Sequence, residues 1–137
     1  MKNNRFNVLD TNVILRAIIN DIPSQAKRAR RLFDSNERIF FISELVLAEC
    51  FYVLQTEPYS FPKEQSIRLI RGILSLPRVD YDRAVIDPAI DFYAEHPALS
   101  FTDCYLKCFA ENREITPVWT FDKKLVGQSG GIAKIVG

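Results

Sequence analysis

The chain has 137 residues, of which 47% are hydrophobic and 26% charged, a balance typical of one soluble globular domain spanning residues 1–137. Its formal net charge of +1 gives no overall basic field, so a nucleic-acid partner would have to be met by a local patch. The N-terminus lacks the apolar core of a signal peptide, and the most apolar segment carries Ser43, Glu44 and Glu49, which argues against a membrane span.

Short strand-like segments alternate with helix-like segments along the whole chain. Strands are expected at 5–9, 38–42, 78–80, 117–120 and 132–136. Helices are expected at 11–20, 23–35, 44–55, 63–75, 82–95 and 101–113, with a short DKKLV helix at 122–126. This alternation predicts an α/β fold, a three-layer sandwich in which helices cover both faces of a parallel sheet of about four to five short strands. In such a fold, ligands bind beyond the carboxyl ends of the strands.

The cysteines and the single histidine do not form a metal-binding pattern. Cys50, Cys104 and Cys108 lie in apolar helical context without a CxxC pair, which predicts reduced, buried thiols in a cytoplasmic protein. His96 precedes Pro97 in a turn-like stretch, where a surface or capping role is expected. A zinc site is therefore not predicted.

Three aspartates stand where a strand ends or a helix begins. Asp10 directly follows the first strand, Asp122 follows the fourth, and Asp103 lies three residues after Ser100 at the start of a helix. Each has a structural interpretation as a helix cap or as a charge that suits the helix dipole. Taken alone, Asp10 and Asp122 are explained better by that structural role than by a functional one, and Asp103 is explained equally well by either.

Glu49 is harder to explain by structure alone. The helix that carries it is apolar or aromatic nearly all round, and Glu49 falls between Leu45 and Tyr52, away from the side of Glu44 and Gln55 that is expected to face water. A buried carboxylate is costly unless it is paired. A salt bridge to an arginine or a hydrogen bond to the Tyr52 hydroxyl is the alternative to a functional site.

The four carboxylates together predict more than any one of them. If they converge, something positive must offset their repulsion, and ligands that offer only oxygen select Mg²⁺ or Mn²⁺ over zinc. Such a cation suits chemistry on phosphate groups.

Four segments resemble those of the PIN-domain nucleases, in particular the small VapC-like ribonuclease toxins of type II toxin–antitoxin systems. They are LDTNVILR at 9–16, SELVLAE at 43–49, LSFTDCYL at 99–106 and TFD at 120–122. Their order and spacing match, whereas 57–98 contributes no motif. Cys104 departs from the small alanine that many relatives carry there.

The resemblance implies a Mg²⁺- or Mn²⁺-dependent endoribonuclease, with an RNA substrate, a small antitoxin partner and a homodimeric assembly. It maps the catalytic acids onto Asp10, Glu49, Asp103 and Asp122. On this mapping the metal is held by Asp10, Asp103 and, directly or through water, Asp122, while Glu49 helps hold the metal or orients the attacking water. Whether one metal or two are bound is left open.

Supporting polar and basic residues are also implied near the acids. Thr11, Asn12 and Thr120 would support the acidic site. Arg16, Lys123 and Lys124 could contact RNA phosphates, as could the basic cluster at 27–31, although ordinary surface charge explains each of them equally well.

Three other classes of protein remain to be compared. A phosphatase with a paired-aspartate motif would need an acid where Asn12 stands, and a phosphoacceptor receiver-type domain would need an acidic neighbour to Asp10. A catalytically silent PIN-like module that binds RNA or protein is the alternative outside catalysis, and the presence of all four acids argues against it.

Overall fold

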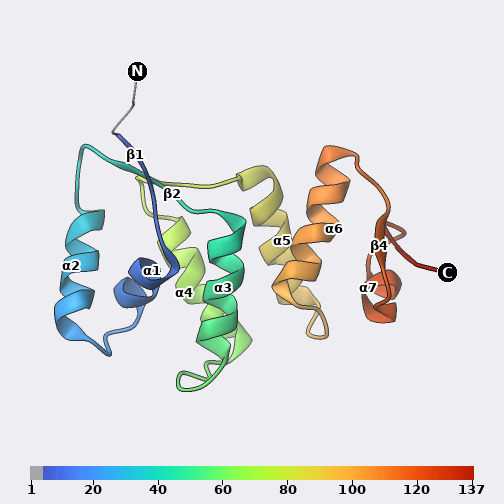
Figure 1. Cartoon of the computed structure of the whole chain (residues 1–137), viewed down its shortest axis with the longest axis horizontal. Coiled ribbons are helices and arrows are strands. Elements are labelled where there is room, and N and C mark those ends of the chain that lie inside the picture. Colours follow the sequence, from blue (N-terminus) through green and yellow to red (C-terminus); the bar gives the residue numbers. More distant parts are fainter. Residues whose placement is uncertain (1–4) are drawn as a thin grey trace. The chain divides into compact units, whose positions relative to one another are not determined.

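The computed structural model describes residues 5–137 and contains every strand and helix expected from the sequence (Figure 1). The strands are β1 (Phe6–Val8), β2 (Ile39–Phe41), β3 (Val79–Asp80), β4 (Val118–Thr120) and β5 (Ala133–Ile135). The helices are α1 (Thr11–Ile18), α2 (Pro23–Phe33), α3 (Glu44–Gln55), α4 (Lys63–Leu74), α5 (Arg83–Glu95), α6 (Phe101–Arg113) and α7 (Lys123–Gln128). The strands pair in parallel throughout, which confirms the predicted α/β class.

The chain forms two compact units, one ending at Tyr81 and the other running from Asp82 to Gly137. The first unit contains a sheet in the order β1–β2–β3 and the helices α1 to α4. The second contains the pair β4–β5 and the helices α5 to α7. The single domain predicted over 1–137 stays a prediction.

The core of the first unit fixes the direction in which β1 ends. Phe40 of β2 is buried and lies opposite Asn7 of β1. Leu9 is buried too, and its N–H donates to the carbonyl of Phe41 across 3.2 Å. Burial of a side chain of this size contributes about 1.5–3 kcal/mol, so the strand end is held firmly. Asp10 follows at once, at the carboxyl end of β1.

The first turns of α3 and α4 follow from local sequence signals. Ser43 is the N-cap of α3, and its hydroxyl accepts the Val46 N–H at 3.3 Å, as its position before the apolar run predicts. Pro62 precedes α4, whose buried face contains Ile67, Ile70 and Leu74, the side predicted from the 3.6-residue period.

The second unit is built on the pair of helices α5 and α6. The rings of Tyr93 on α5 and Phe101 on α6 meet edge to face at 5.9 Å. In the strand pair, Val118 lies opposite Ala133. The loop between α7 and β5 contains Gly130 and Gly131, both with positive φ, where a residue without a Cβ carries no strain.

Three sequence expectations about burial and membrane contact can be compared with this fold. Cys50, Cys104 and Cys108 are buried free thiols, as predicted. The imidazole Nδ1 of His96 lies 2.7 Å from the Phe92 carbonyl at the end of α5, which confirms its capping role. Across residues 5–137, no helix combines the length and the apolar composition needed to cross a bilayer.

Candidate active site

Asp10 occupies the N-cap position of α1 but does not cap the helix with its side chain. Its backbone is extended, with φ −80° and ψ 153°, and its carboxylate accepts no capping hydrogen bond. The first turn of α1 is instead formed with the Asp10 backbone carbonyl, which accepts the Val13 N–H at 3.1 Å. The capping interpretation of Asp10 is therefore wrong, and its exposed carboxylate is left available for a ligand.

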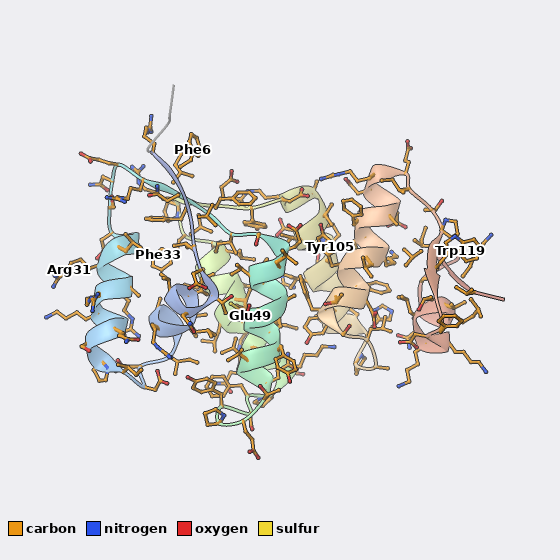
Figure 2. All side chains as sticks on the ribbon, viewed as in Figure 1. Phe6, Arg31, Phe33, Glu49, Tyr105 and Trp119 are labelled. Carbon is orange, nitrogen blue, oxygen red and sulfur yellow. The ribbon has the colours of Figure 1, made fainter. Side chains whose placement is uncertain are left out.

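Glu49 is exposed, so the expectation of a buried carboxylate on α3 is wrong. Leu45 and Tyr52, one turn to either side, are 77% and 70% exposed, whereas Glu44 and Gln55 are half-buried. The face expected to be apolar core is the outer face of α3, and Figure 2 shows Glu49 on this helix. Glu49 forms no hydrogen bond or ion pair with residues 5–137, so its carboxylate is also free to bind a ligand.

These two carboxylates lie near one buried thiol. Burial, followed by the negative charges of Glu49 and then Asp10, raises the pKa of Cys50 to about 12. The first unit thus brings two of the four predicted acids into one electrostatic neighbourhood.

The other two acids are placed by local hydrogen bonds in the second unit. Ser100 caps α6 and accepts the Asp103 N–H at 3.1 Å, so Asp103 stands half-buried in the first helical turn. Asp122 caps α7, and its Oδ1 accepts the Lys124 N–H at 2.9 Å. Its own N–H donates to the Thr120 hydroxyl at 2.9 Å, which gives Thr120 a direct role in orienting the residue.

The donor chemistry of the predicted acids fits a hard divalent cation. Within residues 5–137, no three Asp, Glu, His or Cys side chains are grouped as metal ligands. Asp10 and Glu49 offer only oxygen, and Asp122 keeps one carboxylate oxygen beyond its cap. The meeting of all four acids stays a prediction, because two lie in each unit.

The predicted polar and basic residues have different environments. Thr11 is buried, Asn12 is exposed on the first turn of α1, and Lys123 and Lys124 are exposed on α7. Arg16 is half-buried and engaged in contacts within the first unit. RNA binding by these basic residues stays a prediction.

Arg16 belongs to a polar cluster that sequence reasoning missed. Its guanidinium forms an ion pair with Asp21 at 3.3 Å and donates to Gln25 at 2.9 Å and to the Tyr59 hydroxyl at 3.3 Å. The Tyr59 hydroxyl in turn donates to Asp21 at 2.7 Å, and this bond, followed by the charge of Arg16, lowers the pKa of Asp21. No periodic signal could link residues 38 positions apart.

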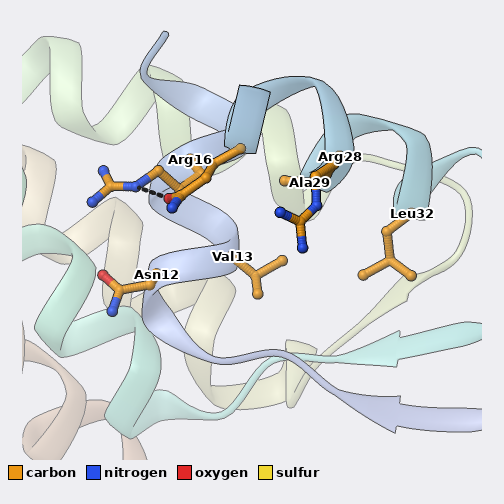
Figure 3. A pocket seen from close by; sticks show the side chains of 7 residues that line it. Asn12, Val13, Arg16, Arg28, Ala29 and Leu32 are labelled. Atoms are coloured by element: carbon orange, nitrogen blue, oxygen red, sulfur yellow. Dashed lines mark hydrogen bonds between the residues drawn. The ribbon is translucent and has the colours of Figure 1, made fainter. Parts of the chain in front are cut away.

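A pocket of about 390 Å³ opens between α1 and α2, next to this cluster (Figure 3). Asn12, Val13 and Arg16 form its α1 side, and Gln25, Arg28 and Leu32 are on its α2 side. It lies entirely within the first unit and begins two residues after Asp10.

Comparison with known proteins identifies the family. The model of the PIN domain family matches residues 8–127, and the chain therefore belongs to the PIN domain family. PIN domains are generally nucleases that use Mg²⁺ or Mn²⁺, so membership supports hydrolase activity, and the observed α/β fold with parallel strands is the fold of this family.

A solved structure is also similar to the chain. It is that of VapBC2 from Rickettsia felis bound to a DNA fragment from their promoter, with 20% identity, a TM-score of 0.38 and coverage of 95% of this chain and 98% of that chain. No curated protein sequence matches the chain.

Proposed function

We propose that the protein is a metal-dependent endoribonuclease that hydrolyses RNA phosphodiester bonds and acts as the toxin of a toxin–antitoxin pair. The observation that supports this proposal most is the family match over 8–127, which contains Asp10, Glu49, Asp103 and Asp122. The free carboxylates of Asp10 and Glu49 add local support, because neither is used by the fold.

Asp10, Asp103 and Asp122 would hold the Mg²⁺ or Mn²⁺ ion, and Glu49 would help to hold it or orient the attacking water. When bound, the ion stabilises negative charge that develops on the phosphate and favours ionisation of water. Asp10 offers its carboxylate from the end of β1, and Thr120 fixes the backbone of Asp122. This hydrolysis requires no attack by the RNA 2′-hydroxyl, so a preference for RNA would come from contacts elsewhere.

The partners and location are part of the same proposal. A small antitoxin, a homodimeric assembly and a cytoplasmic location are proposed from the resemblance of the four segments to VapC-like toxins. Three buried cysteines that form no disulfide within residues 5–137 are in keeping with a reducing compartment.

The direct test compares Asp10→Asn with wild-type protein on a mixed RNA pool with Mn²⁺. We expect Asp10→Asn to abolish cleavage and still fold, since the exposed Asp10 carboxylate makes no capping hydrogen bond that the fold could lose. Removal of one charge from the acidic cluster should also raise the melting temperature of the metal-free protein. Asp34→Asn, at the exposed C-cap of α2, is the matched control and should cleave normally.

Metal binding can be measured apart from turnover. A ligand at ~100 times its Kd stabilises the folded state by about 2.7 kcal/mol, so saturating Mn²⁺ should raise the melting temperature of wild type and not of Asp10→Asn. Full cleavage by Asp10→Asn would disprove the site. Metal-stabilised protein without any turnover on the RNA pool would instead indicate a catalytically silent binding module.

A further inference from the structure

The pocket between α1 and α2 carries a positive charge that the fold does not use. Arg28 forms no hydrogen bond or ion pair with any residue in 5–137. Its side chain extends from α2 toward the α1 side of the pocket in Figure 3. None of the seven lining residues is acidic. The guanidinium of Arg28 therefore faces an open cavity without a carboxylate in its lining.

The other six lining residues are three polar ones, Asn12, Arg16 and Gln25, and three apolar ones, Val13, Ala29 and Leu32, and the polar ones can contact an anion beside Arg28. Arg16 keeps its guanidinium fixed by Asp21, Gln25 and Tyr59, so its charge is partly offset and its position is set. Asn12 adds an exposed amide from the first turn of α1. An exposed arginine that has no ion pair within residues 5–137, beside polar donors, is an arrangement that can bind phosphate oxygens, which a guanidinium contacts in bidentate fashion.

The α1 side of the pocket begins close to Asp10 along the chain. Asn12 lies two residues beyond Asp10, which corresponds to about 3 Å along the helix axis, and Arg16 lies roughly 9 Å along it. A nucleic-acid strand carries one negative charge per nucleotide. A strand whose reacting phosphate is at Asp10 can therefore present a neighbouring phosphate to this pocket.

We propose that this pocket is a subsite for an RNA phosphodiester next to the one that is cleaved, with Arg28 as the residue that binds it. This inference deepens the proposed ribonuclease function and rests on it for the identity of the strand. Arg28 acts here as a positioning residue, because it binds the strand away from the reacting atoms.

The test uses binding of a fluorescein-labelled single-stranded RNA of mixed sequence in EDTA, where cleavage does not contribute. We expect Arg28→Ala to weaken binding about tenfold, the size expected when a hydrogen-bonded charged contact is lost. The slope of log affinity against log salt should also fall by about 0.7, the value for one phosphate contact on a single strand. Arg28→Lys should keep the salt slope while losing part of the affinity, because lysine retains the charge without the planar fork.

The matched control is Arg68→Ala on α4 of the same unit. Arg68 is exposed, does not line the pocket and lies outside the basic cluster at 27–31. Its removal should leave affinity and salt slope close to wild type. Both variants should melt at the wild-type temperature, because neither side chain is used in packing.

Equal effects of Arg28→Ala and Arg68→Ala, or an unchanged salt slope in Arg28→Ala, would overturn the subsite. RNA affinity that is unchanged by Arg28→Ala would also overturn the subsite. A carboxylate of a protein partner would then be the ligand of Arg28 to test. Failure of the nuclease proposal is seen separately, as the absence of Mn²⁺-dependent cleavage by wild-type protein.

Discussion

Asp122 has two roles that a pair of substitutions can separate. Its Oδ1 caps α7 by accepting the Lys124 N–H at 2.9 Å, and its charge is proposed to hold a metal ion. Asparagine keeps the capping oxygen and removes the charge, whereas alanine removes both. The hydrogen bond from the Asp122 backbone N–H to the Thr120 hydroxyl does not use the Asp122 side chain, so it survives in each variant.

The expected magnitudes follow from this geometry. Loss of an aspartate cap to alanine costs about 1 kcal/mol, within a range of about 0.5–2. For a chain of this size that corresponds to a melting temperature lowered by roughly 3–5 °C, measured by circular dichroism without metal. Asp122→Asn should melt close to wild type under the same conditions. Both variants should lose most Mn²⁺-dependent RNA cleavage.

The melting temperature tests the capping role of Asp122, and RNA cleavage tests its role at the metal. A melting temperature for Asp122→Ala equal to that of Asp122→Asn would show that the cap contributes nothing to stability. Wild-type cleavage by Asp122→Asn would show that the charge is not needed, and would remove Asp122 from the proposed site while leaving its structural role intact.

Three further predictions concern the first unit. Tyr59→Phe should return the lowered pKa of Asp21 toward its ordinary value. A carboxyl pKa that is lowered in the folded state stabilises the fold at a pH above the ordinary pKa, so Tyr59→Phe should lower the melting temperature more at about pH 7 than at about pH 2. An equal lowering at both pH values would contradict this. Leu54→Ala, at a fully buried position, should cost about 2–5 kcal/mol in urea unfolding with an unchanged m-value, and a cost below about 1 kcal/mol would refute its core position. With its pKa at about 12, Cys50 is ionised in about one molecule in ten thousand at pH 8, so native protein should resist thiol reagents that label it readily once unfolded.

The elements of the fold were predictable because their signals are local. Ser43 as a cap and Pro23 and Pro62 at helix starts mark boundaries that a few neighbouring residues decide. The β-rich segment at 38–42 contains β2 for the same reason. Such signals survive in any tertiary context that does not oppose them.

The errors occurred where tertiary contacts decide. The side of α3 with Glu44 and Gln55 was expected to face water, yet Leu45 and Tyr52 are the exposed residues, because sequence alone does not say which side of an apolar helix meets the core. For Asp10, the helix cap was the structural alternative to a functional role, and the structure removes it because only the backbone carbonyl of Asp10 starts α1. The bonds between Tyr59 and the α1–α2 turn depend on chain reversal over many residues, which no short pattern encodes.

The exposure of Glu49 has a consequence for how the chain tolerates mutation. Because its side chain packs against nothing that the fold requires, nearly any residue that a helix accepts should be compatible with folding there. In a library screened only for expression level, position 49 should look like an ordinary surface site. If the same library is screened for growth arrest of the host cell, restriction to an acidic residue at position 49 would show that catalysis, and not folding, constrains this position.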